Sequence, residues 1–178
     1  ELPRLRRELE AARQAGVTQA LLGHIGQLPL ARSFGLIPRG DFGLGLTNDE
    51  TAAELARLGF ASATASFESR LAQIRDLSKP LDLELLVYGR LPLMLMEHCI
   101  LRNRGQGCHC QDKPQSLGDR KGEHFPVESA WGCRNELFNA KPLWLADKTD
   151  WRTAGAAYAR LAFLREGPGE CARVFRAY

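Results

Sequence analysis

Short apolar segments alternate along the chain with amphipathic segments of helical period, and this alternation leaves few folds open. The apolar segments are predicted strands and the amphipathic ones predicted helices. Strands are expected at residues 17–25, 36–44, 61–67 and 81–89, and helices at 1–16, 26–35, 48–59 and 68–80, with Asn48 as an N-cap. Because the two types alternate at intervals of roughly 20 to 30 residues, they predict right-handed βαβ units and a parallel sheet.

The alternation stops after Gly89 and resumes at Thr149. We interpret the residues between as an insertion, within which 117–127 is predicted to form a β-hairpin. Beyond it, 149–156 and 167–178 are predicted helices and 157–165 a predicted strand. The chain is therefore expected to be a single domain fragment, with βα units over 1–88, a cysteine-rich insertion over 89–148 and a final βα unit over 149–178.

About five βα units are too few for a closed barrel, which needs eight strands and typically ~250 residues. Either an open doubly wound sheet or the carboxyl-terminal half of a (β/α)8 barrel fits the pattern. Polar residues at the strand ends favour the half barrel, because barrels build their active sites there. The expected substrate-binding residues are His24, Asp41, Glu68, Tyr88 and Arg90, although polarity also begins at the end of any strand.

The chain begins on Glu1 without a methionine, which suggests a piece of a longer protein. A half barrel leaves unpaired strand edges and an open core. We therefore expect the amino-terminal half of the barrel to be supplied in cis or by a partner chain.

Composition indicates an ordinary soluble protein, with 44% hydrophobic residues, 25% charged residues and a net charge of +3. No apolar run is long enough to cross a membrane, and the charged amphipathic start differs from a signal peptide. These features predict a cytoplasmic protein without a membrane partner. Basic residues near the cysteines are either solvated surface or a site for a polyanion such as RNA: Arg102, Arg104, Lys113, Arg120 and Lys121.

Four of the five cysteines fall within the insertion, at Cys99, Cys108, Cys110 and Cys133. Four thiolates make a complete ligand set for zinc or for an iron–sulfur cluster, whereas disulfides are improbable in a cytoplasmic chain. The C-x-C pair is unusual for zinc, and the spacing alone does not name the metal. Free or buried thiols remain the alternative, and Cys171 is expected to be a small buried residue of the last helix.

Three segments in order, "VYGRLPLMLMEHC", "LGDRKGEHFPV" and "NELFNAKPLWLAD", resemble the peptidase U32 family, the collagenase-like proteases. Upstream, "GDFGLGLTNDETAAELARLGFASATASFE" is similar to a barrel segment of that family. The resemblance implies the carboxyl-terminal half of a TIM-like barrel with a cysteine-bearing insertion. Several members resemble factors that hydroxylate tRNA or rRNA bases, or ubiquinone, without oxygen and that carry a [4Fe-4S] cluster on four cysteines.

Many members have a histidine and a further cysteine where this chain has Tyr88 and Pro92. The reading "YGRLPLM" resembles the branch associated with ribosomal RNA hydroxylation. In that branch the implied cluster ligands are Cys99, Cys108, Cys110 and Cys133.

Three functions are weighed on these grounds. The first is an iron–sulfur-dependent factor for oxygen-independent hydroxylation of rRNA or tRNA bases. The second is a collagenase-like peptidase, although the sequence holds no H-E-x-x-H or G-x-S-x-G motif. Four cysteine ligands would also leave a zinc ion without an open coordination position for a catalytic water. The third is a zinc-stabilised binding module without enzymatic activity.

Overall fold

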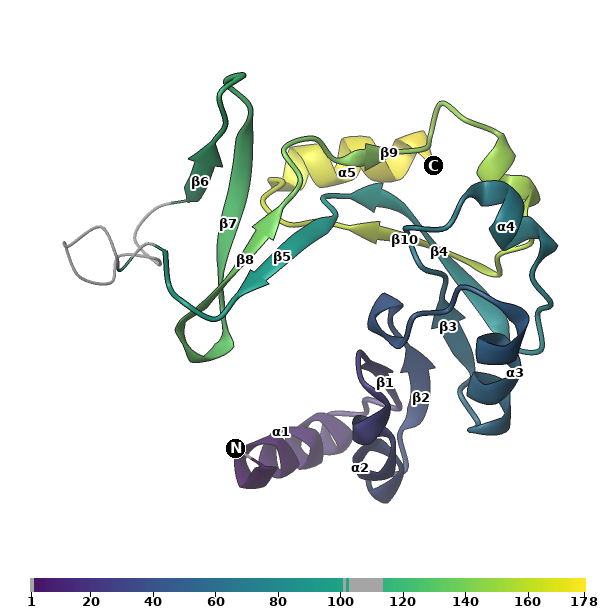
Figure 1. The fold of residues 1–178 in the computed structure, drawn as a ribbon. Coiled ribbons are helices and arrows are strands. Elements are labelled where there is room, and N and C mark those ends of the chain that lie inside the picture. The colour runs from purple at the N-terminus through teal and green to yellow at the C-terminus, as the bar shows by residue number, and fades with distance from the viewer. Residues whose placement is uncertain (1, 101, 103–113) are drawn as a thin grey trace. The chain divides into compact units, whose positions relative to one another are not determined.

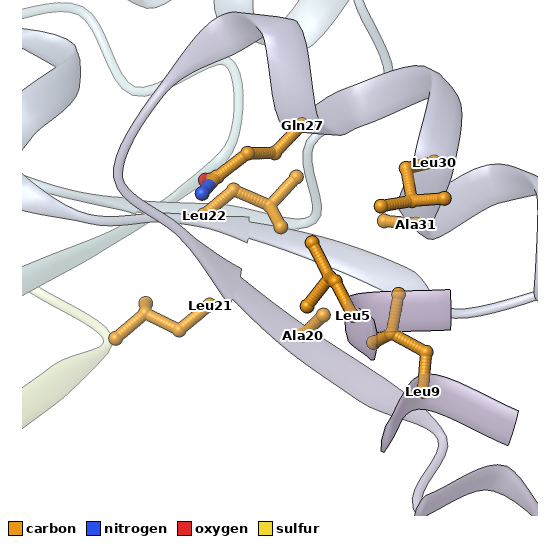
Figure 2. A pocket seen from close by; sticks show the side chains of 8 residues that line it. All are labelled: Leu5, Leu9, Ala20, Leu21, Leu22, Gln27, Leu30 and Ala31. Atoms are coloured by element: carbon orange, nitrogen blue, oxygen red, sulfur yellow. The ribbon is translucent and has the colours of Figure 1, made fainter. Parts of the chain in front are cut away.

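The computed structural model describes residues 2–100, 102 and 114–178 (Figure 1). The chain divides into two compact units. Unit 1 comprises Glu1–Leu86 and Lys148–Arg160, and unit 2 comprises Val87–Asp147 and Leu161–Tyr178. Both units are therefore built from two separate stretches of the chain.

Unit 1 contains a curled parallel sheet that forms part of a barrel. Its strands are β1 (Gln19–Leu22), β2 (Ile37–Gly40), β3 (Ser62–Thr64) and the first part of β4 (Asp82–Gly89), paired in that order. The last strand, β10 (Tyr158–Ala162), follows β4 in the strand order. This mixed α/β arrangement confirms the parallel βα units and the partial barrel that the sequence predicts.

Helices connect the strands of unit 1, as the periodicity predicts. They are α2 (Leu28–Ser33), α3 (Asp49–Arg57) and α4 (Leu71–Asp76), while α1 (Leu2–Gln14) precedes β1. The predicted cap of α3 is confirmed, because Asn48 Oδ1 accepts a hydrogen bond of 2.8 Å from the Thr51 N–H. The helix expected at 149–156 is instead a 3₁₀ helix, Asp150–Ala154, which ends at Gly155 in the left-handed region with φ 72°.

Alternation of side chains gives the sheet of unit 1 two different faces. One face is apolar and buried, with Leu22, Ala63, Leu83 and Leu85 among its residues. Gly40 lies on this face, where an added Cβ would come within 2.8 Å of Leu44 Cδ1. The other face carries hydroxyl, carboxylate and guanidinium groups from the same strands, so strands of mixed polarity can form one sheet.

Unit 2 contains an antiparallel sheet of four strands. Their order is β5 (Pro92–Met96), β8 (Arg134–Phe138), β7 (His124–Ala130) and β6 (Gln115–Gly118). The predicted hairpin is confirmed as β6 and β7, and Asp119 Oδ1 holds its turn by accepting hydrogen bonds from the N–H groups of Lys121 and Glu123. Strands β5 and β8 lie in the segment where the sequence suggests only an insertion.

Two further elements pack beside the end of β4 in unit 2. Strand β9 (Leu143–Trp144) pairs antiparallel with Tyr88 and Gly89, and helix α5 (Pro168–Ala177) begins with the proline expected near its start. At Gly89 the backbone of β4 lies close to that of β10. The φ of Gly89 is 139°, and an added Cβ would lie 2.5 Å from the Ala162 carbonyl oxygen. Only glycine fits this contact without movement of one strand.

Aromatic side chains and two valines form the interior of this part of unit 2. The Tyr88 ring contacts the rings of Trp144 and Phe163, with centroids 5.7 and 5.4 Å away, while Val87 and Val174 are fully buried.

No helix among the described residues is both long and apolar enough to cross a membrane.

Candidate functional site

A network of charged side chains crosses the polar face of the unit 1 sheet. Arg160 from β10 forms ion pairs with Asp41, at 2.6 Å, and with Glu84. Its other guanidinium nitrogen donates a hydrogen bond of 2.9 Å to Thr64 Oγ1. The three charged side chains are only about one-fifth exposed, at 19% for Arg160, 22% for Asp41 and 21% for Glu84. Two carboxylates therefore share one guanidinium in a largely buried position.

The sheet register explains why these residues meet. Thr64 lies opposite Glu84 in the parallel pairing, and its hydroxyl lies 2.8 Å from Glu84 Oε1 and 3.1 Å from the Gly40 carbonyl oxygen. Asp41 directly follows the last residue of β2 and also accepts a 2.8 Å hydrogen bond from the Phe42 N–H. Asp41 and Thr64 thus stand at the carboxyl ends of their strands, where barrel enzymes place their active sites.

A second polar layer lies nearer the beginnings of the same strands. Arg39 donates hydrogen bonds to Gln19 Oε1 and to Ser62 Oγ, and its guanidinium lies 5.0 Å from the centre of the Tyr158 ring. The Tyr158 hydroxyl in turn donates to Asp82 at 3.1 Å. This layer therefore adds polar contacts to the same face of the sheet, nearer the strand beginnings than Asp41 and Thr64.

Two phenylalanines follow the strand ends next to the network. The Phe42 and Phe67 rings lie with centroids 5.2 Å apart and planes tilted by 59°. Phe42 begins the 3₁₀ helix Phe42–Leu44, whose N-cap is Asp41, and Phe67 comes three residues after β3. Both side chains are partly exposed. An aromatic surface and a set of polar donors and acceptors therefore adjoin the ends of β2 and β3.

The other two residues that the sequence analysis expects in unit 1 lie apart from this network. His24 is exposed, and its Nδ1 accepts a 3.0 Å hydrogen bond from the Gly26 N–H, so it caps a short 3₁₀ helix, Ile25–Gln27. Glu68 is exposed, and its N–H donates to Ser66 Oγ at 3.3 Å. Neither side chain contacts Arg160 through a hydrogen bond or ion pair within the described part of the chain.

Tyr88 and Arg90 belong to unit 2 and have structural partners there. Tyr88 is buried and donates a 3.0 Å hydrogen bond to Glu166 Oε1, while Arg90 donates to the backbone carbonyls of Asn139 and Ala140. Burial, followed by the hydrogen bond and the negative charge of Glu166, raises the pKa of Tyr88 to about 12. The Tyr88 hydroxyl therefore stays neutral at ordinary pH and is unsuited to act as a base.

Glu166 is held as a carboxylate by the groups around it. Burial acts to raise its pKa, but hydrogen bonds from backbone N–H groups, including those of Leu164 and Arg165, and from the Tyr88 hydroxyl outweigh burial. The net result is a pKa below the ordinary value for glutamate. Within unit 2 the neutral Tyr88 hydroxyl thus donates a hydrogen bond to the charged Glu166 carboxylate.

Two of the four predicted cysteine ligands lie among the described residues. Cys99 is buried and Cys133 is exposed, and both are free thiols. Cys99 follows the end of β5 by three residues. The N–H of the next residue, Ile100, donates a 2.8 Å hydrogen bond to Asn135 Oδ1. Cys133 is the one non-glycine residue with positive φ in the described chain, at 61°. Such backbone strain is concentrated at functional positions and turns.

Cys108 and Cys110 lie outside the described residues. No group of three or more potential metal ligands occurs within residues 2–100, 102 and 114–178, which contain only two members of the predicted quartet. The geometry of the full quartet stays a prediction.

Of the four residues in the network, Asp41 is predicted from the sequence, whereas Arg160, Glu84 and Thr64 are not. Glu84 stands within a nearly continuous apolar run, and Arg160 lies in the last predicted strand, 119 residues from Asp41. The signal that could have found them is alternation, because residues two apart in a strand lie on the same face of the sheet. Polar or ionisable residues at every second position of two predicted strands therefore indicate one polar face. Comparison with protein-family models, curated proteins and solved structures gives no match for this chain.

Proposed function

We propose that this chain is part of an iron–sulfur-dependent factor that hydroxylates bases of ribosomal or transfer RNA without oxygen. The observation that carries the proposal is the network of Arg160, Asp41 and Glu84 beside the partly exposed Phe42 and Phe67. The resemblance of the cysteine-bearing segments to the U32 family supports the same assignment. The partial barrel would then be the carboxyl-terminal half of a TIM-like barrel, completed in cis or by a partner chain.

The network has the chemistry needed to hold a nucleobase. The edge of a base presents both N–H donors and carbonyl or ring-nitrogen acceptors. Carboxylates such as Asp41 accept hydrogen bonds, and the guanidinium of Arg160 donates them. Proteins that bind unpaired bases stack them on aromatic side chains, a role open to the Phe42 and Phe67 rings. We assign base binding to these residues of unit 1.

The cysteines would supply the redox part of the activity. Cys99 and Cys133, together with Cys108 and Cys110, would hold a [4Fe-4S] cluster through four thiolates, and such a cluster transfers single electrons. The buried side chain of Asn135 fixes the backbone beside Cys99, and residues that orient ligands in this way affect metal affinity. The cysteine ligands are therefore assigned to unit 2.

The peptidase alternative has weaker support in the described structure. A hydrolytic nucleophile needs an adjacent base within hydrogen-bond reach. The Thr64 hydroxyl is buried, lies close to the Gly40 carbonyl oxygen and Glu84, and accepts a hydrogen bond from Arg160. These contacts tie the hydroxyl into the network and leave it poorly placed to attack a peptide bond.

The metal assignment is tested by anaerobic purification of the chain and measurement of iron, sulfide and zinc. We expect a brown protein with iron and sulfide in equal amounts, and we expect Cys133→Ser to lose most of both. Cys171→Ser is the matched control, because Cys171 lies in α5 outside the predicted quartet. A colourless protein with zinc and no iron would instead support the zinc-stabilised binding module.

The substrate assignment is tested by nucleoside mass spectrometry of ribosomal and transfer RNA from cells that carry variants of the gene. Phe67→Ala is expected to reduce one hydroxylated nucleoside about tenfold, because stacking on an aromatic ring contributes about 1–3 kcal/mol per base. Phe175→Ala is the control, since Phe175 is 74% exposed on α5. An unchanged RNA profile in a deletion strain, with digestion of gelatin or casein by the purified protein, would favour the peptidase.

A further inference from the structure

Every second residue along β3 and just beyond it carries a hydroxyl group. Ser62 and Thr64 belong to β3, and Ser66 follows the end of the strand by two residues. All three side chains are buried, with exposures of 2%, 1% and 9%. Because residues two apart in an extended chain lie on the same face, the three hydroxyls share the polar face of the unit 1 sheet.

Hydrogen bonds keep the chain extended beyond the end of β3. The Ala65 N–H donates to the Glu84 carbonyl oxygen and the Ser66 N–H donates to the Leu46 carbonyl oxygen, each at 2.9 Å. Leu46 and Ala65 also form a parallel bridge. Ser66 therefore occupies the next position after Thr64 on the polar face, toward the carboxyl ends of the strands.

The hydroxyl of Ser66 has a donor as its partner. Its Oγ accepts a 3.3 Å hydrogen bond from the Glu68 N–H, and no acceptor for its own proton lies among the described residues. The Thr64 hydroxyl differs, because the Gly40 carbonyl oxygen and Glu84 Oε1 both lie within hydrogen-bond distance of it. A hydroxyl can accept and donate at once. The Ser66 proton is thus available to an acceptor on a ligand.

Asp41 supplies the opposite kind of group at the end of the neighbouring strand. Gly40 pairs with Ala63 in the register of β2 and β3, so Asp41 stands level with Thr64. Asp41 Oδ1 accepts from Arg160 and from the Phe42 N–H, whereas Oδ2 accepts no hydrogen bond within the described part of the chain. A ligand at these strand ends would meet an acceptor oxygen on β2 and a hydroxyl donor after β3.

Each of these two polar residues directly precedes one of the two phenylalanines. Phe42 follows Asp41, and Phe67 follows Ser66. The two rings lie with centroids 5.2 Å apart. A base stacked on either ring therefore has its edge close to a hydrogen-bonding group of the adjacent residue.

We propose that Ser66 is a specificity-determining residue, which donates a hydrogen bond to a carbonyl oxygen of the bound base. This assignment rests on the base-binding role proposed above for Asp41, Arg160 and the two phenylalanines. Uracil, cytosine and guanine carry a carbonyl oxygen, and adenine carries none. A site that hydrogen-bonds a substrate group rejects the analogue without that group, because its own polar atom then stays unpaired. Ser66 thus disfavours adenine.

The test is fluorescence anisotropy of labelled oligouridylate and oligoadenylate with the full chain, at one salt concentration. Ser66→Ala is expected to raise the Kd for oligouridylate about fivefold, because one neutral hydrogen bond is lost, and to leave the Kd for oligoadenylate unchanged. The change that the variant causes is compared between the two RNAs, since the two bases stack with different strength.

Two further variants complete the set. Ser66→Thr keeps the hydroxyl and should retain most of the affinity for oligouridylate. Ser62→Ala is the matched control, because Ser62 is a buried serine of the same strand and face whose Oγ accepts from Arg39 near the beginning of the strand. It should leave both Kd values unchanged. Circular dichroism and thermal unfolding check that each variant retains the fold.

Separate results decide this proposal and the one on which it rests. If neither RNA binds, or if an abasic oligomer binds as tightly as oligouridylate, the chain does not recognise bases and both proposals fail. If the chain binds bases but Ser66→Ala changes both Kd values equally, or changes neither, the role of Ser66 is overturned and the base-binding assignment stands.

Discussion

The two units of this molecule hold their buried polar groups in different ways. The parallel sheet of unit 1 gathers charged side chains on one face, where the guanidinium of Arg160 forms ion pairs with the carboxylates of Asp41 and Glu84. In unit 2 the buried polar groups are a neutral hydroxyl, Tyr88, and a neutral amide, Asn135. The first arrangement depends on every charge being present. The second depends on a few hydrogen bonds of neutral side chains, one of which, from Tyr88, is accepted by the carboxylate of Glu166.

This difference indicates where each unit tolerates change. Loss of one member of a largely buried ion pair leaves the other charge poorly solvated, which costs more than the pair itself contributes. Loss of one neutral hydrogen bond leaves a single unsatisfied group, at a smaller cost. We therefore expect the charged face of unit 1 to be the more sensitive of the two.

The largest effect is expected for Arg160→Met. Removal of the guanidinium leaves Asp41 and Glu84 facing each other without a cation, and we expect the free energy of unfolding to fall by about 3 kcal/mol. Urea unfolding followed by circular dichroism measures the change. Arg57→Met is the control, since Arg57 pairs with Glu54 on the exposed surface of α3 and its loss should change stability little. Equal effects of the two variants would show that burial adds nothing to the contribution of the Arg160 ion pairs, which would contradict the sensitivity expected of the charged face of unit 1.

A somewhat smaller effect is expected from alkaline pH acting on Tyr88. Its pKa is raised from 10.0 to about 12, so between these values the unfolded chain loses the phenolic proton while the folded chain retains it. The stabilisation is complete below pH 10 and is lost as the pH rises to about 12, which amounts to about 2–3 kcal/mol.

Urea unfolding at several pH values, with ultraviolet absorption of tyrosinate, follows this transition. Tyr88→Phe should reduce the alkaline loss, although burial also raises the pKa of Tyr178, which leaves part of the loss in place. Tyr158→Phe, at an exposed position in unit 1, should retain the loss. If Tyr88→Phe and the unaltered chain lose stability equally between pH 10 and 12, the buried hydroxyl of unit 2 is not the responsible group.

A neutral change in unit 2 provides the matched counterpart to Arg160. Asn135→Ala removes the acceptor of the Ile100 N–H beside Cys99, and we expect a loss of about 1–2 kcal/mol in unfolding free energy. Asn139→Ala is the control, because it removes no side-chain hydrogen bond within the described residues. A loss for Asn135→Ala larger than that for Arg160→Met would reverse the order of sensitivity proposed for the two units.

The smallest effect on stability is expected for the helix cap of α3, one of the helices that connect the parallel strands of unit 1. Asn48→Ala removes the hydrogen bond to the Thr51 N–H and should lower the unfolding free energy by about 1 kcal/mol. Asn48→Asp keeps an acceptor oxygen at the same place and should retain most of the stability. Thermal unfolding of the three chains measures the difference, and equal melting temperatures would show that α3 is held by packing alone.

Sequence reasoning succeeds in unit 1 because its period is regular. Strands and helices follow one another there, and local signals such as Asn48 fix the helix starts. It also identifies the hairpin in unit 2, where Asp119 and Gly122 form the turn. These are local patterns within about ten residues, and the physics that creates them is local as well.

Contacts between distant residues escape such reasoning. Arg160 reaches Asp41 across 119 residues, and no local pattern in either segment indicates the pairing. The strands β5 and β8 also pair across a long separation, and their apolar and polar residues do not alternate cleanly. Tyr88 has the position of a strand-end polar residue, but its structural partner, Glu166, lies 78 residues along the chain.

The glycine of the Y-G-R sequence shows what kind of constraint a short motif can encode. At position 89 the chain backbone lies against Ala162, with no room for even one methyl group. A comparison of related chains should therefore find this position invariant, or changed only together with residue 162. An invariant glycine here would report the spacing of two strands, and by itself it would say nothing about a ligand.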